Sequence, residues 1–135
     1  MSIPVRRASA LFHDTWLPDE TRRIRAEVRE FAESVLRPQA HRLNTTPESV
    51  DSFPRDIFDA MAQAGLYQIP FSADVGGRGL EFPTLATLTV LEELAYFSAG
   101  VASALYDGQA ILVGKTLEQA PEPLRSKYLP QLVHG

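Results

Sequence analysis

Residues 85–113 read LATLTVLEELAYFSAGVASALYDGQAILV, and this stretch decides the fold. After the Glu92–Glu93 pair, the only charged residue before Lys115 is Asp107. Apolar surface left in water would forfeit about 25 cal/mol for each Å², so the rest of the chain must cover much of this segment. A single helix rising about 1.5 Å per residue would be longer than a small domain is wide. We therefore expect breaks near Gly100 and Gly108.

The segment before this stretch predicts an amphipathic helix that starts near Pro18. Its apolar residues recur at steps of three and four, which gives one buried stripe: Ile24, Val28, Phe31 and Val35. Its charged residues are expected to face water for the most part: Arg22, Arg25, Arg29, Glu30 and Glu33. Pro38 should bend or stop this helix.

Two further helices are indicated by their end signals. One starts at or near Pro54 and ends where Gly65 can supply a left-handed cap. Residues 66–69 then predict an extended run, and residues 72–79 (SADVGGRG) a glycine-rich loop. The last helix is opened by Pro121 and Pro123 and has Pro130 inside it.

No alternating β pattern persists, so the sequence predicts an all-α fold, an orthogonal or up-and-down bundle of about five to six helices. A chain of 135 residues is one domain by size. Arg6 and Arg7 stand among small residues with no acid before Asp14, a pattern that resembles an organelle transit peptide, but we favour the simpler interpretation that residues 1–16 are a flexible N-terminal arm. Residues 17–135 form the helical domain.

Composition excludes several classes of function. The net charge is −4 and no basic face is evident, which argues against a nucleic-acid partner. The chain has no cysteine, so disulfides and thiolate metal sites are excluded, and the three histidines lack a second ligand at metal spacing.

Residues 94–114 could cross a bilayer by length, but Asp107, Gln109 and two glycines favour a buried bundle helix instead. The cytoplasm is the expected location.

The motifs with possible chemistry have structural explanations. Gly114-Lys115-Thr116 resembles the end of a phosphate-binding loop, but position 109, where the earlier glycine is required, is Gln109. Glu92 and Glu93 point about 100° apart on a helix, so they predict a solvated or salt-bridged pair rather than an acid/base pair. We identify no catalytic residue and no metal site in this chain.

One stripe of residues suggests a binding surface. Positions i, i+1, i+4, i+5 and i+8 of a helix carry mostly small residues with one aromatic and one acid: Ala102, Ser103, Tyr106, Asp107 and Ala110. Small side chains allow another group to approach closely. Periodicity alone favours a second helix packed against this stripe over a ligand.

Read as a whole, the chain resembles the N-terminal helical domain of the acyl-CoA dehydrogenases. The resemblance rests on four segments, which together with their connections run from about residue 17 to the end: VLRPQAHRLN (35–44), FPRDIFDAMAQAGLYQIPFSADVGGRGL (53–80), LATLTVLEELAYFSAGVASAL (85–105) and LRSKYLPQLVHG (124–135). The segment LEQAPEPLR (117–125) departs from the Gly-Thr/Ser turn that is usual in the family.

The resemblance implies an FAD-dependent oxidoreductase that removes hydrogen from the α and β carbons of an acyl-CoA. In this family FAD lies between a β-domain and a C-terminal helical bundle, which also supplies the catalytic glutamate. Neither is represented here, so this chain alone is expected to be inactive and to bind no FAD of its own. The expected partners are the acyl-CoA substrate and the missing domains or a complementary subunit, in a homo-oligomeric full enzyme.

The family's acyl-pocket wall falls on Ala102, Ser103, Tyr106, Asp107 and Ala110, the stripe found from spacing. A bulky ring at Tyr106 is expected to limit or bend the acyl chain, or to favour an aromatic or branched one. Asp107 replaces a small uncharged residue. Because an unpaired buried carboxylate is costly, there are three alternatives: Asp107 is paired, the substrate carries polar groups, or this position does not correspond to the family's pocket wall.

Two other readings remain open at this point. Flavin monooxygenases and nitroalkane oxidases share the architecture, so the chain could belong to one of them. A non-catalytic helical module that binds a hydrophobic ligand or completes a partner subunit is the alternative from a different class.

Overall fold

The first helix begins as the sequence predicts. In the computed structural model, which describes residues 14–110 and 112–135, α2 (Asp19–Phe31) follows directly after Pro18. Asp19 and Glu20 lie in its first turn, where the helix dipole favours negative charge. Residues 1–13 of the predicted arm lie outside the described residues, and the last three residues of that arm form a short 3₁₀ turn, η1 (Asp14–Trp16).

The helix continues past Pro38 by changing its winding. A π turn, η2 (Ala32–Leu36), leads into the 3₁₀ turn η3 (Arg37–Gln39) and then into α3 (Ala40–Thr45). The buried stripe changes accordingly, because a π turn accommodates an extra residue and rotates the side chains beyond it. Ala32 and Leu36 are fully buried, whereas Phe31 and Val35 of the predicted stripe are only partly so.

The next elements lie between the first helix and the central one. The turn η4 (Val50–Ser52) precedes α4 (Arg55–Gln63), which buries Ile57 and Met61. Gly65 adopts the predicted left-handed conformation, with φ of 65°. The extended run predicted at residues 66–69 is wrong: Leu66–Gln68 form the 3₁₀ turn η5, because Leu66 and Tyr67 both turn into the core.

The central stretch folds as three successive helical pieces, α5 (Pro83–Ala95), α6 (Ala99–Ala104) and the π turn η7 (Leu105–Ala110). The first break falls at residues 96–98 rather than at Gly100, because the Ser98 hydroxyl caps the new helix by accepting from the Val101 N–H. The second break lies near Gly108 as expected: the π turn that contains this glycine ends at Ala110, and the next helix begins at Gly114.

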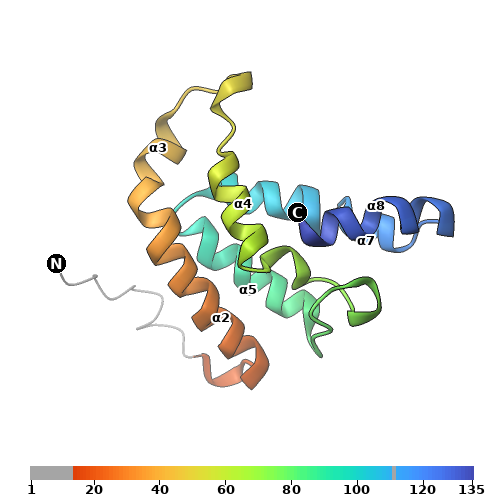
Figure 1. Cartoon of the computed structure of the whole chain (residues 1–135). Helices are drawn as coiled ribbons and strands as arrows, with labels where there is room; N and C mark the ends of the chain where they lie inside the picture. Colours follow the sequence, from red (N-terminus) through yellow and green to blue (C-terminus); the bar gives the residue numbers. More distant parts are fainter. Residues whose placement is uncertain (1–13, 111) are drawn as a thin grey trace.

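The C-terminal part consists of α7 (Gly114–Glu118) and α8 (Glu122–His134), which extend to one side of the molecule (Figure 1). Pro130 lies inside α8 as predicted. Phe71, Leu129 and Val133 form a second small core where α8 meets the loop at residues 72–79, which contains the 3₁₀ turn η6 (Ala73–Val75). The described residues contain no strand, and the all-α prediction is confirmed.

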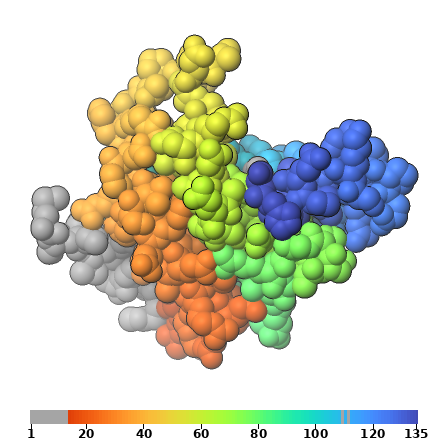
Figure 2. All heavy atoms as spheres, in the orientation of Figure 1, coloured from red at the N-terminus to blue at the C-terminus, as the bar shows by residue number. Residues whose placement is uncertain are grey.

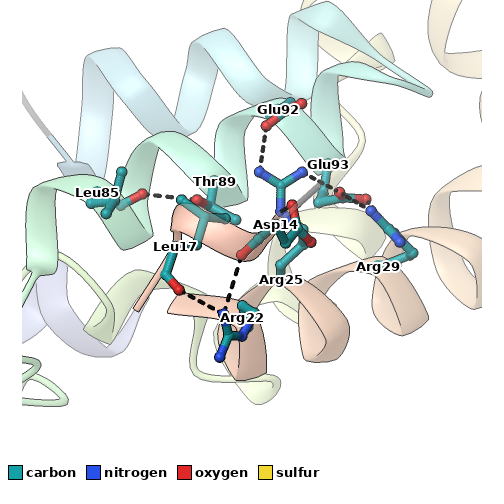
Figure 3. A network of polar contacts seen from close by, with 9 residues as sticks. All are labelled: Asp14, Leu17, Arg22, Arg25, Arg29, Leu85, Thr89, Glu92 and Glu93. Carbon is teal, nitrogen blue, oxygen red and sulfur yellow. Dashed lines mark hydrogen bonds and ion pairs between the residues drawn. The ribbon is translucent and has the colours of Figure 1, made fainter. Parts of the chain in front are cut away.

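The main core lies between α2, α4, α5 and α6, with α2 and α5 packed side by side (Figure 1). Among its fully buried side chains is a carboxylate, that of Glu93, at 1% exposure. Arg25 and Arg29 of α2 both reach this carboxylate, and Arg25 also contacts Glu92 and Asp14 (Figure 3). The prediction that Arg25 faces water is therefore wrong: the arginine crosses to α5 and is 14% exposed.

None of the helices in the described ranges has the length and apolarity needed to pass through a bilayer.

Candidate functional site: one face of the α6–η7 segment

The five residues predicted to form a binding stripe do not all share one face of the segment. Ala102 and Ala110 are buried and pack into the protein. Ser103, Tyr106 and Asp107 are exposed, and the Tyr106 side chain retains 37% of its accessible surface. Of the five predicted residues, three are therefore at the surface, and the two alanines belong to the protein interior.

The π turn accounts for this division. Ala102 and Ala110 are eight residues apart, and in a regular helix they would point about 80° away from each other. The wider winding over Leu105–Ala110 rotates Ala110 back toward the core side. Tyr106 and Asp107 belong to the same turn and are exposed. A π turn cannot be read from periodicity, since the amino acids in it are ordinary for a helix.

Two hydrogen bonds fix where this segment starts. The Ser98 side chain caps α6, and Asn44 of α3 donates through Nδ2 to the Phe97 carbonyl at 2.7 Å. Asn44 also donates to the Ala40 carbonyl at 2.7 Å, so the amide ties the end of the first helix to the turn before α6. Sequence reasoning missed both residues. Ser98 could have been found as a capping residue ahead of a run of small residues.

The exposed face carries one negative charge without a partner in the described part of the chain. Asp107 forms no hydrogen bond or ion pair with another described side chain, and the same holds for the Tyr106 hydroxyl. By contrast, the buried Glu93 carboxylate has two arginines. A carboxylate in water needs no partner, but one enclosed in an apolar pocket does.

A separate cleft of about 590 Å³ is lined in part by residues of α6. It is bounded by α3, the connector at residues 46–54, α4 and the start of α6, and Leu43, Phe58, Val101 and Ala104 give it an apolar floor. The connector stands out from the body of the molecule beyond α3 and α4 (Figure 2). None of the five predicted residues lines this cleft.

The glycine-rich loop at residues 72–79 is no nucleotide cradle. A Cβ atom on Gly77 would come within 2.2 Å of the Phe71 carbonyl oxygen, so glycine is needed there for close packing against the chain itself.

The lysine of the Gly114-Lys115-Thr116 motif has partners within the chain. Lys115 forms an ion pair with Glu118 at 2.7 Å, and its ammonium group lies over the Phe71 ring. Among the described residues, no cluster of three or more carboxylate or imidazole ligands could hold a metal ion.

The described residues form an all-α domain in which the surrounding helices pack against the apolar central stretch. The acyl-CoA dehydrogenase N-terminal domain family matches residues 18–135. The chain belongs to this family.

Relatives of the chain include several oxidoreductases. It is 30% identical over 119 residues to the short-chain specific acyl-CoA dehydrogenase of Clostridium acetobutylicum, a match that covers 88% of this chain and 30% of that protein. It is 30% identical over 112 residues to the 3-(aryl)acrylate reductase of Clostridium sporogenes, covering 83% and 28% respectively. It is 26% identical over 119 residues to mitochondrial isovaleryl-CoA dehydrogenase of Bos taurus, covering 88% and 27%.

In each of these matches the chain spans less than a third of the relative's length.

Proposed function

We propose that this chain is the N-terminal domain of an FAD-dependent acyl-CoA dehydrogenase-like enzyme and forms part of the wall of its acyl pocket. The family match over residues 18–135 carries the proposal. The structure supports it, because Ser103, Tyr106 and Asp107 lie exposed on a segment whose other side is firmly packed. The domain extends over residues 17–135 in this proposal.

The proposal divides the work between this domain and the rest of the enzyme. In this proposal the β-domain and the C-terminal bundle, on the same chain or on a partner subunit, hold FAD. When bound, FAD supplies a hydride acceptor. The residues of this domain exclude water from the acyl chain and set the shape of its pocket. This chain alone is therefore predicted to be inactive.

The side chains on the wall suggest the shape of the acyl group. The Tyr106 ring would occupy space that an extended chain needs, so a short, branched or aromatic acyl group is favoured. The names of the relatives fit this expectation, since they refer to short-chain, isovaleryl and arylacrylate substrates. Assembly as a homo-oligomer and a cytoplasmic location complete the proposal.

The proposal is tested with the complete enzyme, meaning this chain together with the β-domain and C-terminal bundle. An in-frame continuation after Gly135, or a neighbouring reading frame, should encode a β-rich segment and a late glutamate. The purified complete enzyme should be yellow and should reduce an electron acceptor when short acyl-CoA thioesters are added. Flavin-loaded enzyme without acyl-CoA turnover would contradict the proposed reaction and favour a flavin monooxygenase or nitroalkane oxidase. Turnover by the chain alone would contradict the division of work.

The cleft of about 590 Å³ favours a second candidate function, a non-catalytic module that binds a hydrophobic ligand. Gly100 lies at its edge, and a side chain added there would meet only the Ser98 Oγ atom at 3.9 Å. Gly100→Leu should therefore block the cleft while the fold stays intact. Ligand binding to the isolated chain that this variant abolishes would support the second function.

A further inference from the structure

We infer that Tyr106 and Asp107 select an acyl group that ends in a cation. This inference rests on the proposed function, because it requires that the exposed face of the α6–η7 segment becomes a wall of the acyl pocket. It concerns the residues in which this chain departs from a plain hydrocarbon-lined pocket.

The first step is the state of Asp107. Its carboxylate is exposed and forms no ion pair or hydrogen bond with another described residue. When the pocket closes, water is removed from this carboxylate. An ionised carboxylate without water or a partner is strongly disfavoured, so a hydrocarbon end placed against it would bind poorly.

The second step is the neighbouring aromatic ring. Tyr106 precedes Asp107 in the π turn, and both residues are exposed. A ring face attracts an ammonium or guanidinium group, and a carboxylate accepts its N–H bonds. Ser103 lies one helical turn before Asp107 and is also exposed, which adds a hydroxyl to the same surface. These three groups suit a donor-bearing end better than a methyl group.

The third step is the local winding. Single π turns within helices are rare and are often found at functional sites. Tyr106 and Asp107 are exposed within this turn, while Ala110 stays buried. The acid therefore stands at a fixed backbone position in a helical segment that is packed on one side.

The test compares matched acyl-CoA thioesters in the complete, flavin-loaded enzyme. ω-Aminohexanoyl-CoA and heptanoyl-CoA have the same length and differ only in an ammonium or a methyl end. ω-Guanidinobutanoyl-CoA and ω-ureidobutanoyl-CoA form a second pair of equal shape with and without charge. We expect kcat/KM to be at least tenfold higher for the charged member of at least one pair. Higher kcat/KM for the uncharged member of both pairs would overturn the inference.

The variant Asp107→Asn keeps the shape and removes the charge. It should reduce the preference for the charged thioester at least tenfold and raise kcat/KM for heptanoyl-CoA. Glu30→Gln, at an exposed position of α2, makes the same change of charge away from the wall and should leave the ratio unchanged.

Three outcomes separate the possible failures. If neither thioester of any pair is oxidised, nor a short alkanoyl-CoA, the proposed function itself fails. If the alkanoyl-CoA is oxidised equally well by the wild-type enzyme and by Asp107→Asn, the proposed function stands and this inference is overturned. A loss of flavin or of subunit assembly in Asp107→Asn, with unchanged selectivity, would show that the acid pairs with another domain, and would also overturn it.

Discussion

The Arg29 guanidinium donates through Nη2 to the Glu93 carboxylate at 2.8 Å, and that carboxylate is 1% exposed. Arg25 approaches the same oxygen at 3.3 Å. The two arginines lie on successive turns of α2, so both ion pairs connect α2 to the same residue of α5. Glu93 lies two residues before the end of α5 and close to the turn that leads into α6. This ion pair therefore fixes the central helix just before the candidate wall begins.

Replacement of Glu93 by Gln should lower the free energy of unfolding by about 3 kcal/mol, because it leaves the two arginines without their buried partner. Urea denaturation monitored by circular dichroism measures this change. Glu92→Gln is the matched control, since Glu92 is 58% exposed and its pair with Arg25 should contribute less than about 1 kcal/mol. Equal losses in the two variants would contradict the structural role of Glu93.

Gly77→Ala should destabilise the loop at residues 72–79 by about 2 kcal/mol or more. The added methyl group would lie 2.2 Å from the Phe71 carbonyl oxygen, which is backbone and cannot move aside cheaply. Thermal unfolding measures the loss. Gly100→Ala serves as the comparison: no atom lies closer than 3.9 Å to the added methyl group, so stability should stay equal or rise by up to about 1 kcal/mol. A tolerated alanine at position 77 would show that the loop is packed differently.

Ser98→Ala should cost about 1 kcal/mol, because the side chain caps α6 by accepting from the Val101 N–H. The proper comparison is Ser103→Ala, a change of the same atoms at an exposed position within α6. That variant should be neutral or slightly stabilising, since alanine favours a helix. Chemical denaturation of both variants under one set of conditions measures their free energies of unfolding. If Ser98→Ala left this free energy unchanged, the Ser98 side chain would not stabilise α6 as a cap.

Alkaline pH should destabilise the fold through Tyr67. Burial, with a smaller effect of the nearby Asp59 charge, raises the pKa of this phenol to about 12. In the unfolded chain the pKa is near 10, so above about pH 10 the unfolded state loses its proton first. The contribution of the neutral phenol is complete below pH 10 and is lost as the pH rises toward 12.

This pH dependence is measured by urea denaturation between about pH 8 and 11.5. Tyr67→Phe provides the control, because it has no proton to lose. That variant should cost about 1 kcal/mol at neutral pH, since the phenol donates to the Phe58 carbonyl at 3.0 Å. Its stability should fall less steeply at alkaline pH than that of the wild-type protein. Parallel curves for the two proteins would argue against a raised pKa.

Much of the fold is readable from local signals. Pro18 and Gly65 mark helix ends in the way their backbone restrictions dictate, and the apolar stretch at residues 85–113 is central as predicted. The errors arise where tertiary contacts decide. Arg25 looks like a surface residue in the sequence, but it is drawn to Glu93, which lies 68 residues further along the chain.

The candidate site is less predictable than the fold. Spacing alone puts Ala102 and Ala110 on the same face as Tyr106 and Asp107, because it assumes regular helical winding. The two π turns, η2 and η7, invalidate that assumption at the two places where the predicted stripes are wrong in detail. Asn44 was missed because its role depends on a carbonyl 53 residues away.

The π turn at Leu105–Ala110 also gives this segment an unusual tolerance to changes of length. Because a π turn holds one extra residue, deletion of one residue from it restores ordinary helical winding and leaves the helical segments on its two sides facing as before. A single-codon deletion in a related gene would thus remove one side chain from this surface and keep the packing of the flanking segments.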